Sequence, residues 1–389
     1  MKYKHISVAI PVLAEYDNLP RLVESLRCQT LSDFSVYCCV NNCEGWADDC
    51  DEYHHSVFCD NQMSLNFLRQ FPFKILDYSS VGNGWRDKQQ GVGWARKVLF
   101  EAIAEGCDDN EIIVSLDADT VFSETYLESV IDVMNGHPDR SAICVPYYHP
   151  LSGDDNTDRS MLRYEMYMRY YFLSLKESGN PYAFTALGSA MVFPLWAYRR
   201  VGGITPLQGG EDFYLMQKFA KTGTIILSCN EVVRPQGRSS VRVPFGTGPA
   251  IAKGIDFIEA AYPFYPFEGF RAVDETYALF PRLYSEEIET PMSDFLRQQL
   301  KTESLWQPLR KNFKNKELFV HACQERVDGL RILQYLKTFP LRASEDELQE
   351  FCCRYRIDIS SDFSFRTSPV REINTIRDAL FAIEQRERR

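Results

Sequence analysis

The sequence predicts an α/β protein with a C-terminal helical extension, and two observations carry this prediction. Over the first 150 residues, short apolar runs alternate with amphipathic stretches, which is the pattern of a doubly wound α/β domain. From about residue 270 the strand-like runs give way to mixed-charge segments with helical periodicity. We therefore expect a mainly parallel sheet flanked by helices, followed by a helical unit.

The first elements follow in a regular order. ISVAIPVL predicts a strand at residues 6–13, and DNLPRLVESLRCQT predicts the next helix, because Pro20 suits a first helical turn and four apolar side chains share one face. Further strands are expected in FSVYCCV, FKILDY and EIIVSL. A helix that ends at Gly106 is expected in QQGVGWARKVLFEAIAEG.

After residue 120 the alternation weakens. TYLESVIDVMN predicts a helix, AICVPYY a strand, and RSMLRYEMYMRYYFLSLKES a long helix whose aromatic side chains are interpreted as core. YAFTALGSAMVFPLWAYRRVGG places small residues before a short helix. GGEDFYLMQKFAKTG predicts a helix that opens with two acids and closes at Gly223.

A chain of 389 residues exceeds one ordinary domain, so we expect two, at 1–265 and 266–389. The later segment shows helical periodicity and no recognisable chemistry, so a chain that ends near residue 265 is expected to keep a folded sheet domain. The alternative is that Phe264, Phe267 and Phe270 pack back onto that domain, since so aromatic a stretch is a poor free linker. Both alternatives stay open.

Composition excludes several classes of protein. A net charge of −11 argues against a nucleic-acid binder, which needs a basic face to displace counterions. No run approaches the roughly 18 apolar residues of a membrane span, and acidic residues come too early for a signal peptide. We expect a cytoplasmic protein with cysteines mostly as thiols. The helical extension could serve acceptor binding, dimer contact or docking on the inner face of the membrane.

One cysteine-rich segment offers zinc-type ligands. CEGWADDCDEYHHSVFC holds Cys43, Cys50, His54, His55 and Cys59. Their spacing matches no common zinc finger. We therefore interpret them as unliganded residues of a long loop, with structural zinc as the alternative.

Acidic and amide side chains follow the predicted strands at one edge of the sheet. Ligands of open α/β sheets bind beyond the carboxyl ends of the strands, where Glu15, Asn41, Asp117 and Asp119 are all expected. In SLDADTVF the two aspartates project to the same side. Paired carboxylates suit Mg²⁺ or Mn²⁺ held together with substrate phosphates, so the expected ligand is a diphosphate. The alternative for this pair is a solvated turn.

Other candidate residues have two interpretations each. Glu211 and Asp212 open a helix, where acids also complement the helix dipole. The small residues Gly188 and Ser189 could let an acceptor approach the backbone, or could pack in the core. Three arginines in an acidic chain could close over a diphosphate or form a solvated turn; they are Arg234, Arg238 and Arg242. Trp85 and Trp94 could stack on a sugar or base, but core positions are preferred.

The motifs together resemble one known family. VAIPVLAEYDNLPRLVESLRCQTLSDFSVYCCVNN resembles the first β-α-β unit of family 2 glycosyltransferases, which have a GT-A fold and often begin with a strand, P-x-x-x-E, a helix and Q-T. GVGWARKV, SLDAD, ALGSAMVF and GGEDFYL follow in the order of that family. The resemblance covers residues 5–245. It implies a Rossmann-like GT-A fold, with a mainly parallel mixed sheet flanked by helices.

The resemblance also implies roles for individual residues. Asp212 matches the catalytic base, with Glu211 beside it, and a positioned carboxylate is what a sugar hydroxyl needs to become a nucleophile. Asp119 would hold the metal, and Asp117 would approach the ribose or the metal. The remaining residues of the expected nucleotide-sugar site are Pro11, Val12, Glu15, Asn41, Arg96, Gly188, Arg238 and Arg242.

The implied activity is inverting, metal-dependent transfer from a nucleotide-diphosphate sugar to a hydroxyl. A UDP-sugar, Mn²⁺ or Mg²⁺, and a carbohydrate or lipid-linked acceptor of glycan or cell-surface polysaccharide biosynthesis are expected. Asn41 and Asn42 stand where many relatives have an aspartate pair, so base recognition would use an amide. RPQGRSSVRVPFGTG only loosely resembles the motif of processive synthases, which carry membrane helices, so processive export is disfavoured.

Two other functions are weighed against this one. A sugar-phosphate nucleotidyltransferase should show a glycine-rich phosphate loop with a basic residue directly after the first strand, and PVLAEYDN has neither. A non-catalytic carbohydrate-binding protein on the same fold would tolerate loss of Asp119 or Asp212. Both aspartates are present, which favours an enzyme.

Overall fold

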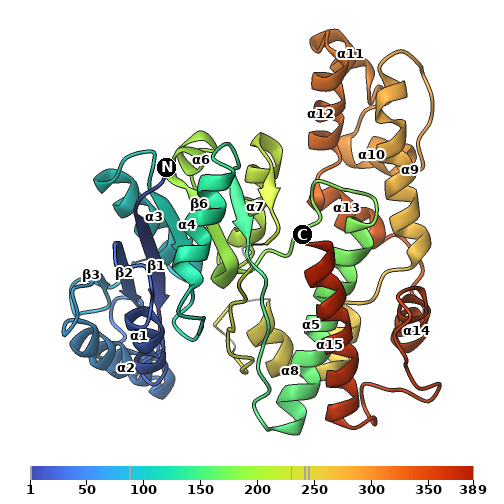
Figure 1. The fold of residues 1–389 in the computed structure, drawn as a ribbon. Coiled ribbons are helices and arrows are strands. Elements are labelled where there is room, and N and C mark those ends of the chain that lie inside the picture. Colours follow the sequence, from blue (N-terminus) through green and yellow to red (C-terminus); the bar gives the residue numbers. More distant parts are fainter. Residues whose placement is uncertain (1, 87–88, 229, 241, 244–245, 389) are drawn as a thin grey trace. The chain divides into compact units, whose positions relative to one another are not determined.

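The computed structural model describes residues 2–86, 89–228, 230–240, 242–243 and 246–388. Within them lies a seven-stranded sheet of order β3-β2-β1-β4-β6-β5-β7 (Figure 1). The strands are β1 (Ile6–Val12), β2 (Phe34–Asn41), β3 (Lys74–Tyr78), β4 (Ile112–Ser115), β5 (Ala142–Cys144), β6 (Met191–Pro194) and β7 (Ile225–Ile226). Strands β3, β2, β1 and β4 run parallel, β6 is antiparallel to β4 and β5, and β5 is parallel to β7. The predicted mainly parallel mixed sheet flanked by helices is confirmed.

The central strands form because they are apolar on both faces. In β1 and β4 nearly every residue is buried, as expected for parallel strands covered on both sides. Helix α1 (Leu19–Arg27) begins with a proline in its first turn and buries four apolar side chains, as predicted. The other helices of this part of the chain are α2 (Glu52–Leu68), α3 (Val92–Gly106), α4 (Tyr126–Gly136), α6 (Leu195–Arg200) and α7 (Glu211–Thr222).

The chain divides into two compact units. The first contains the described residues of Met1–Met161 and Thr185–Gly254, with Arg388, and the second contains Leu162–Phe184 and Ile255–Glu387. Helix α8 (Thr247–Ala261) is broken at Gly254, whose φ of 77° is left-handed, so the division coincides with a change of backbone direction. The units differ from the predicted domains because most of α5 (Asp155–Lys176) belongs with the C-terminal helices. The functional boundary at residue 265 stays a prediction.

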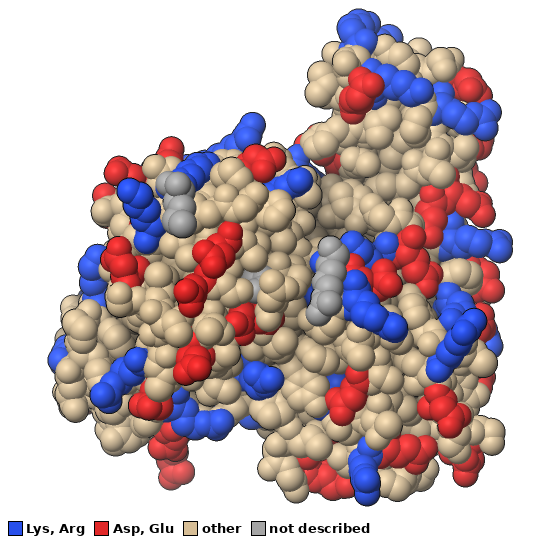
Figure 2. Space-filling model, in the orientation of Figure 1, with Lys and Arg blue, Asp and Glu red and all other residues tan. Residues whose placement is uncertain are grey.

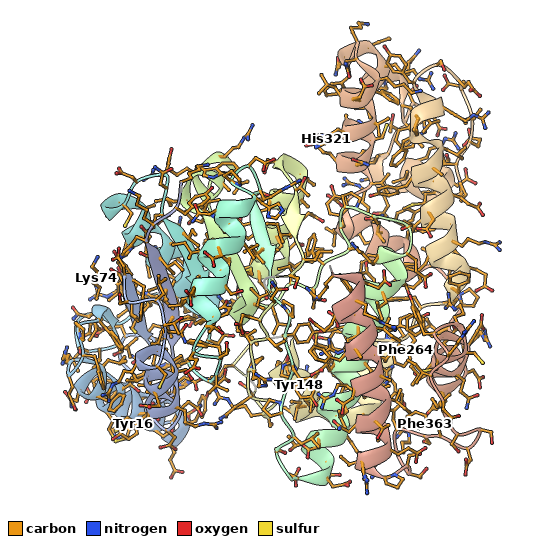
Figure 3. All side chains as sticks on the ribbon, in the orientation of Figure 1. Tyr16, Lys74, Tyr148, Phe264, His321 and Phe363 are labelled. Carbon is orange, nitrogen blue, oxygen red and sulfur yellow. The ribbon has the colours of Figure 1, made fainter. Side chains whose placement is uncertain are left out.

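The second unit is helical and has an aromatic core. Tyr170 of α5 lies 5.0 Å from Phe264, 5.9 Å from Phe270 and 4.6 Å from Phe351, between ring centroids. Phe264, labelled in Figure 3 with Phe363, also packs near Phe365. The aromatic stretch is therefore packed against α5. The helices that follow α8 are α9 (Phe267–Leu283), α10 (Ser293–Leu300), α11 (Gln307–Asn312), α12 (Lys316–Arg326), α13 (Gly329–Leu336), α14 (Ser344–Arg354) and α15 (Val370–Glu387).

Buried ion pairs join α5 to α15 inside the second unit. Arg169 bonds to Glu165 on its own helix at 2.5 Å and to Glu384 on α15. Arg377 of α15 returns to Glu165 at 3.2 Å. All four side chains are fully buried, so the loss of one partner leaves a charge without compensation, at a cost of about 3–5 kcal/mol.

The cysteine-rich segment corrects one expectation. Glu52–Leu68 is helix α2 and not part of a long loop, and Asp51 caps it by accepting a hydrogen bond from the Tyr53 amide at 2.8 Å. His54 is held by Asp49 at 2.8 Å and stacks on Trp46. Within residues 43–59, all of which are described, no three of the Cys, His, Asp and Glu side chains are arranged to hold a metal ion.

Two further observations bear on partners. On the face shown in Figure 2, acidic and basic side chains are interspersed. Among the described helices, none is both long enough and apolar enough to cross a membrane.

We predict that a chain ending at residue 265 is not recovered as soluble, folded protein. The truncation removes Glu384 and Phe351, so Arg169 and Tyr170 of α5 lose buried partners and α5 exposes an aromatic surface. Size-exclusion chromatography and circular dichroism of both lengths test this. A monodisperse truncated protein with native helix content would show that α5 does not depend on the C-terminal helices.

Candidate active site

The candidate site lies in the first unit, where β1 and β4 end and α7 begins. Glu15 follows β1, Asp117 and Asp119 follow β4, and Glu211 and Asp212 open α7. Three arginines bind these acids, and they come from α3 and from the segment after β7; they are Arg96, Arg238 and Arg242. The predicted edge of the sheet thus brings together acids from the first, middle and last of the motifs noted in the sequence.

Arg96 joins the end of β4 to the start of α7. Its Nη2 lies 2.6 Å from Asp117 Oδ1, and its Nη1 donates to Glu211 Oε1. The side chains of Arg96 and Glu211 are only 4% and 2% exposed. Burial alone would lower the pKa of Arg96, but the charges of Asp117 and Glu211 outweigh it and raise the pKa. The guanidinium therefore stays charged and holds both acids.

Gly188 makes room for this arginine. A Cβ at Gly188 would lie 1.9 Å from Arg96 Nη2, closer than any side chain could tolerate. Ser115 at the end of β4 fixes the glycine by donating to its carbonyl at 2.7 Å. Gly188 and Ser189 are both buried, so they take the core position that was one of their two interpretations. Close approach of Arg96 explains the small residue.

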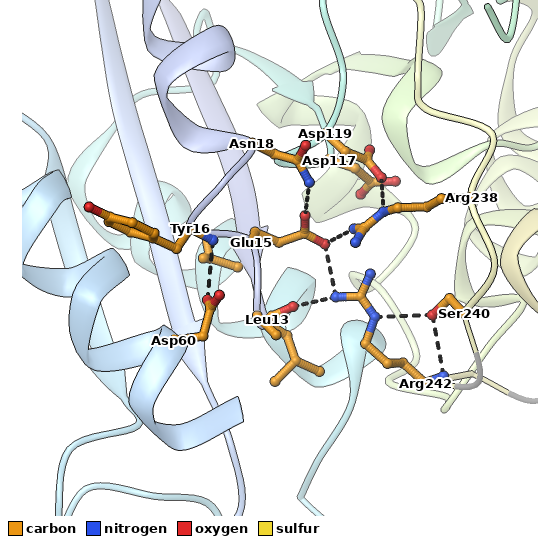
Figure 4. Close-up of polar contacts among 12 residues, drawn as sticks. Leu13, Glu15, Tyr16, Asn18, Asp60, Asp117, Asp119, Arg238, Ser240 and Arg242 are labelled. Carbon is orange, nitrogen blue, oxygen red and sulfur yellow. Dashed lines mark hydrogen bonds and ion pairs between the residues drawn. The ribbon is translucent and has the colours of Figure 1, made fainter. Parts of the chain in front are cut away.

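Arg238 and Arg242 lie over the acids at the ends of β1 and β4 (Figure 4). Arg238 donates to Glu15 and, through Nε, to Asp119 Oδ2 at 3.1 Å. Arg242 Nη1 lies 2.8 Å from Glu15 Oε1 and also donates to the Leu13 carbonyl. These two arginines therefore do not form a solvated turn, whereas Arg234 is exposed.

Two carboxyl groups of the site have strongly raised pKa values. Burial, and then the negative charges of Glu15 and Asp117, raise the pKa of Asp119 to about 7 against the opposing effect of Arg238. Burial and the charge of Glu211 raise the pKa of Asp212 to about 7, with Arg96 opposing. Five carboxylates against three guanidinium groups leave two negative charges in excess when all are ionised.

This excess charge fits a divalent cation. Asp117 and Asp119 offer hard carboxylate oxygens after β4, and a bound cation would favour their ionised forms. In the part of the chain that the structure describes, no three His, Cys, Asp or Glu side chains are arranged to hold a metal ion by themselves. The two aspartates would therefore need phosphate oxygens of a ligand to complete the coordination of Mg²⁺ or Mn²⁺.

Asp212 occupies the first turn of α7. Its Oδ1 accepts a hydrogen bond from the Phe213 amide at 2.7 Å, and the side chain is half-buried. Gly210, with φ of 76°, allows the chain to turn sharply into the helix. Glu211 is buried against Arg96, so the two neighbouring acids have different surroundings and Asp212 is the one with access to a ligand.

The remaining predicted residues lie at the ends of β1 and β2. Pro11 and Val12 are the last residues of β1, and the Val12 side chain is fully buried, so only its backbone could meet a ligand. The Asn41 amide donates to the Val12 carbonyl at 3.0 Å and thereby joins the two strand ends. Trp85 is buried against Tyr78, as preferred, and Trp94 is half-buried.

The sequence did not indicate Asn61 of α2. Its Nδ2 donates to the Asn41 carbonyl and to Asn42 Oδ1, both at 2.9 Å, and its Oδ1 accepts from the Ala14 amide at 3.0 Å. Ala14 has a left-handed φ of 51°, which this hydrogen bond helps to hold. Asn61 therefore positions the backbone that carries Glu15. Asn61 could have been noticed only if residues 52–68 had been predicted as a helix.

Comparison with known proteins finds a glycosyltransferase family in the middle of the chain. The model of "Glycosyl transferase family group 2" matches residues 112–301, slightly less than half of the chain, and these residues are similar to that family. The match begins at β4 and therefore includes both acid pairs, and it extends beyond residue 245, where the noted resemblance ends. Together with the mixed sheet, it confirms the predicted GT-A fold. No curated protein matches the sequence.

Solved structures show a more distant likeness. TarS residues 1–349 from S. aureus with UDP is 11% identical, covering 83% of this chain and 91% of that chain, with a TM-score of 0.40. A Pyrobaculum calidifontis mannosyltransferase with GDP-Man and Mn²⁺ is 11% identical (97% and 86% covered, TM-score 0.37). Glucosyl-3-phosphoglycerate synthase from Mycobacterium tuberculosis with Mn²⁺ and UDP is 12% identical (60% and 70% covered, TM-score 0.36). At these values the likeness assigns no residue, donor or metal to this chain.

We predict that Gly188→Ala destabilises the protein by about 3–5 kcal/mol, because the new Cβ displaces Arg96 and leaves buried charges unpaired. Gly106→Ala is the matched control, since a Cβ at the end of α3 meets open space. Urea unfolding of both variants measures the effect. Equal unfolding midpoints for the two variants would contradict the close approach of Gly188 to Arg96.

Proposed function

We propose that the protein is an inverting, metal-dependent glycosyltransferase that moves a sugar from a UDP-sugar to a hydroxyl group. The acceptor is a carbohydrate or a lipid-linked carbohydrate of glycan or cell-surface polysaccharide biosynthesis. One observation carries the proposal: Arg96 binds both Asp117 and Glu211. Asp117 lies close in sequence to Asp119, which would hold the metal, and Glu211 directly precedes Asp212, which would be the base. Donor and acceptor chemistry would therefore share one rigid group of side chains.

On the donor side, Asp119 and Asp117 would hold Mn²⁺ or Mg²⁺. The cation would offset the charge that develops on the departing diphosphate. Arg238 and Arg242 carry planar guanidinium groups that suit phosphate oxygens, and their present partners are carboxylates. Donor binding would exchange part of these ion pairs for pairs with phosphate.

Base and ribose would lie beyond the ends of β1 and β2. The residues there are Pro11, Val12, Glu15 and Asn41, with Val12 contributing its backbone. The Gly188 position would act through Arg96, because its own surface is buried against that side chain. Arg96 would also act indirectly, because its guanidinium group is bonded to two carboxylates and would position them.

On the acceptor side, Asp212 would take the proton of the attacking hydroxyl. The hydroxyl oxygen forms a bond to the anomeric carbon while the bond from that carbon to the diphosphate oxygen breaks. The electron pair of the broken bond leaves with the diphosphate, and attack from the opposite face inverts the anomeric centre. With a pKa of about 7, the basic form of Asp212 grows as pH rises through neutrality, so turnover should rise over the same range.

Glu211 would assist without touching the substrate. It is buried and bonded to Arg96, which fixes the start of α7 and so the place of Asp212. A cytoplasmic setting completes the proposal, and a lipid-linked acceptor would bring the protein to the inner face of the membrane.

We predict that UDP raises the melting temperature with Mn²⁺ and not with EDTA, because the aspartates and the diphosphate would share the cation.

Asp119→Asn should weaken this metal-dependent binding. Asp212→Asn should retain UDP binding and lose about 10²–10⁴-fold in sugar transfer from UDP-sugars. Asp139→Asn, at an exposed acid, is the control for both.

Two results would count against this assignment. Equal stabilisation by UDP with EDTA would remove the metal from the proposal. Loss of UDP binding in Asp212→Asn would mean that Asp212 belongs to the donor site and is not the base.

A further inference from the structure

We propose that a pocket on the side of α7 opposite Asp212 is a subsite for an anionic sugar unit of the acceptor, one that carries a phosphate or a carboxylate group. This inference rests on the proposed glycosyltransferase function and specifies its acceptor. The pocket belongs to the first unit and is separate from the acids and arginines of the candidate active site.

Helical spacing separates the pocket from the base. Tyr214, Gln217, Lys218 and Lys221 are spaced three or four residues apart and share one face of α7. The residues three, four and seven positions after Asp212 form the opposite, buried face of the helix; they are Leu215, Met216 and Phe219. From Asp212 to Lys221 the helix rises by roughly 13 Å, and the two residues lie on opposite faces of a helix roughly 10 Å across, so an acceptor needs several sugar units to reach both places.

The pocket has the size and the lining of a ligand site. Its volume is about 440 Å³, within the roughly 300–1,000 Å³ range of small-molecule sites. It is lined by Thr205, Leu207, Tyr214, Gln217, Lys218 and Lys221. These described lining residues include two ammonium groups and no carboxylate, in a chain whose net charge is −11. The lining therefore favours an anion.

Lys218 is already held in place. Its Nζ donates to the Gly203 carbonyl at 2.8 Å and to Thr205 Oγ1 at 3.2 Å, both in the loop that forms the pocket wall. An ammonium group has three donors, so one remains for a ligand. Burial, and then the positive charge of Lys97, lower the pKa of Lys218, so a bound anion would relieve a repulsion that the free protein carries.

Another lining group suits a sugar ring. Tyr214 is 36% exposed and presents an aromatic body with a hydroxyl at its tip. An anion without a ring would use the lysines alone, so a sugar phosphate should bind more tightly than inorganic phosphate.

The loop that forms part of the pocket wall ends at the first acid of the candidate active site. The loop at residues 202–210 is bracketed by Gly202, Gly203 and Gly210, all with left-handed φ, and ends at Glu211. Its middle rests on α3, because a Cβ at Gly93 would lie 2.1 Å from the Leu207 carbonyl oxygen. The same loop thus contacts the helix that carries Arg96 and precedes the acid that Arg96 binds.

A simpler role for the lysines is to complement the dipole at the end of α7 and to anchor the loop. That role needs no ligand. Isothermal titration calorimetry of the full chain with glucose 6-phosphate, glucuronate, inorganic phosphate and glucose, with UDP and Mg²⁺ at saturation, separates the two. We expect the first two to bind, phosphate to bind more weakly and glucose not to bind.

Variants locate the binding. Lys221→Gln and Tyr214→Ala should each weaken glucose 6-phosphate binding by about tenfold, as expected for loss of one charge-assisted contact or of the ring. Lys4→Gln, at an exposed lysine of the same unit, should leave binding unchanged. All three should bind UDP as the unaltered chain does, because the pocket holds none of the donor residues.

Three results would overturn the proposal: no binding of either anionic sugar, binding that the two pocket variants do not weaken, or binding that appears only when UDP is omitted, which would place the anion at Arg238 and Arg242. Intact UDP binding alongside any of these leaves the proposed function standing. Failure of UDP to bind would instead remove the proposed function, while the pocket can still be titrated with UDP omitted.

Discussion

The buried guanidinium group of Arg96 organises the candidate active site. Arg96 has access to almost no water, so its charge is tolerable only while Asp117 and Glu211 remain beside it. Those acids come from segments far apart in the sequence, and Gly188 supplies the space in which all three meet. The ends of β4 and the start of α7 are therefore fixed relative to each other by charge. Asp212 inherits its place from its neighbour Glu211.

The side of the site proposed to bind the donor is arranged differently, because its ion pairs are less buried. Arg238 and Glu15 are 32% and 8% exposed in their side chains, and Arg238 also reaches Asp119. The acids keep an excess of negative charge even with these arginines present, and burial together with the charges of Glu15 and Asp117 raises the pKa of Asp119 to about 7. A site of this kind gains stability from a cation and offers guanidinium groups to an anion. A metal-bound diphosphate satisfies both requirements.

The elements that position the site could mostly be predicted from the sequence. Strands β1, β2 and β4 are apolar runs of adequate length, and α7 opens with two acids and closes at a glycine, so local pattern was sufficient. Strand β6 was not predicted, since small residues precede it and a helix follows at once. Helix α2 was missed because Cys and His residues interrupt its apolar periodicity.

Pairings across long sequence distances could not be predicted. Arg96 was expected at the nucleotide, and its partner Glu211 lies 115 residues away, beyond any local pattern. Asn61 was overlooked with α2, and α5 was grouped with the sheet because its buried partners Phe351 and Glu384 come much later in the chain. In each case residue types were informative about chemistry, while the fold decided which residues meet.

The most direct test is a crystal structure of the full chain with UDP and Mn²⁺. We expect the cation at Asp119 with diphosphate oxygens completing its coordination, Arg238 moved from Asp119 to the phosphates, and Arg96 still bonded to both Asp117 and Glu211. A nucleotide bound away from the ends of β1 and β4, or an Arg96 released from Glu211 to contact the nucleotide, would contradict this expectation.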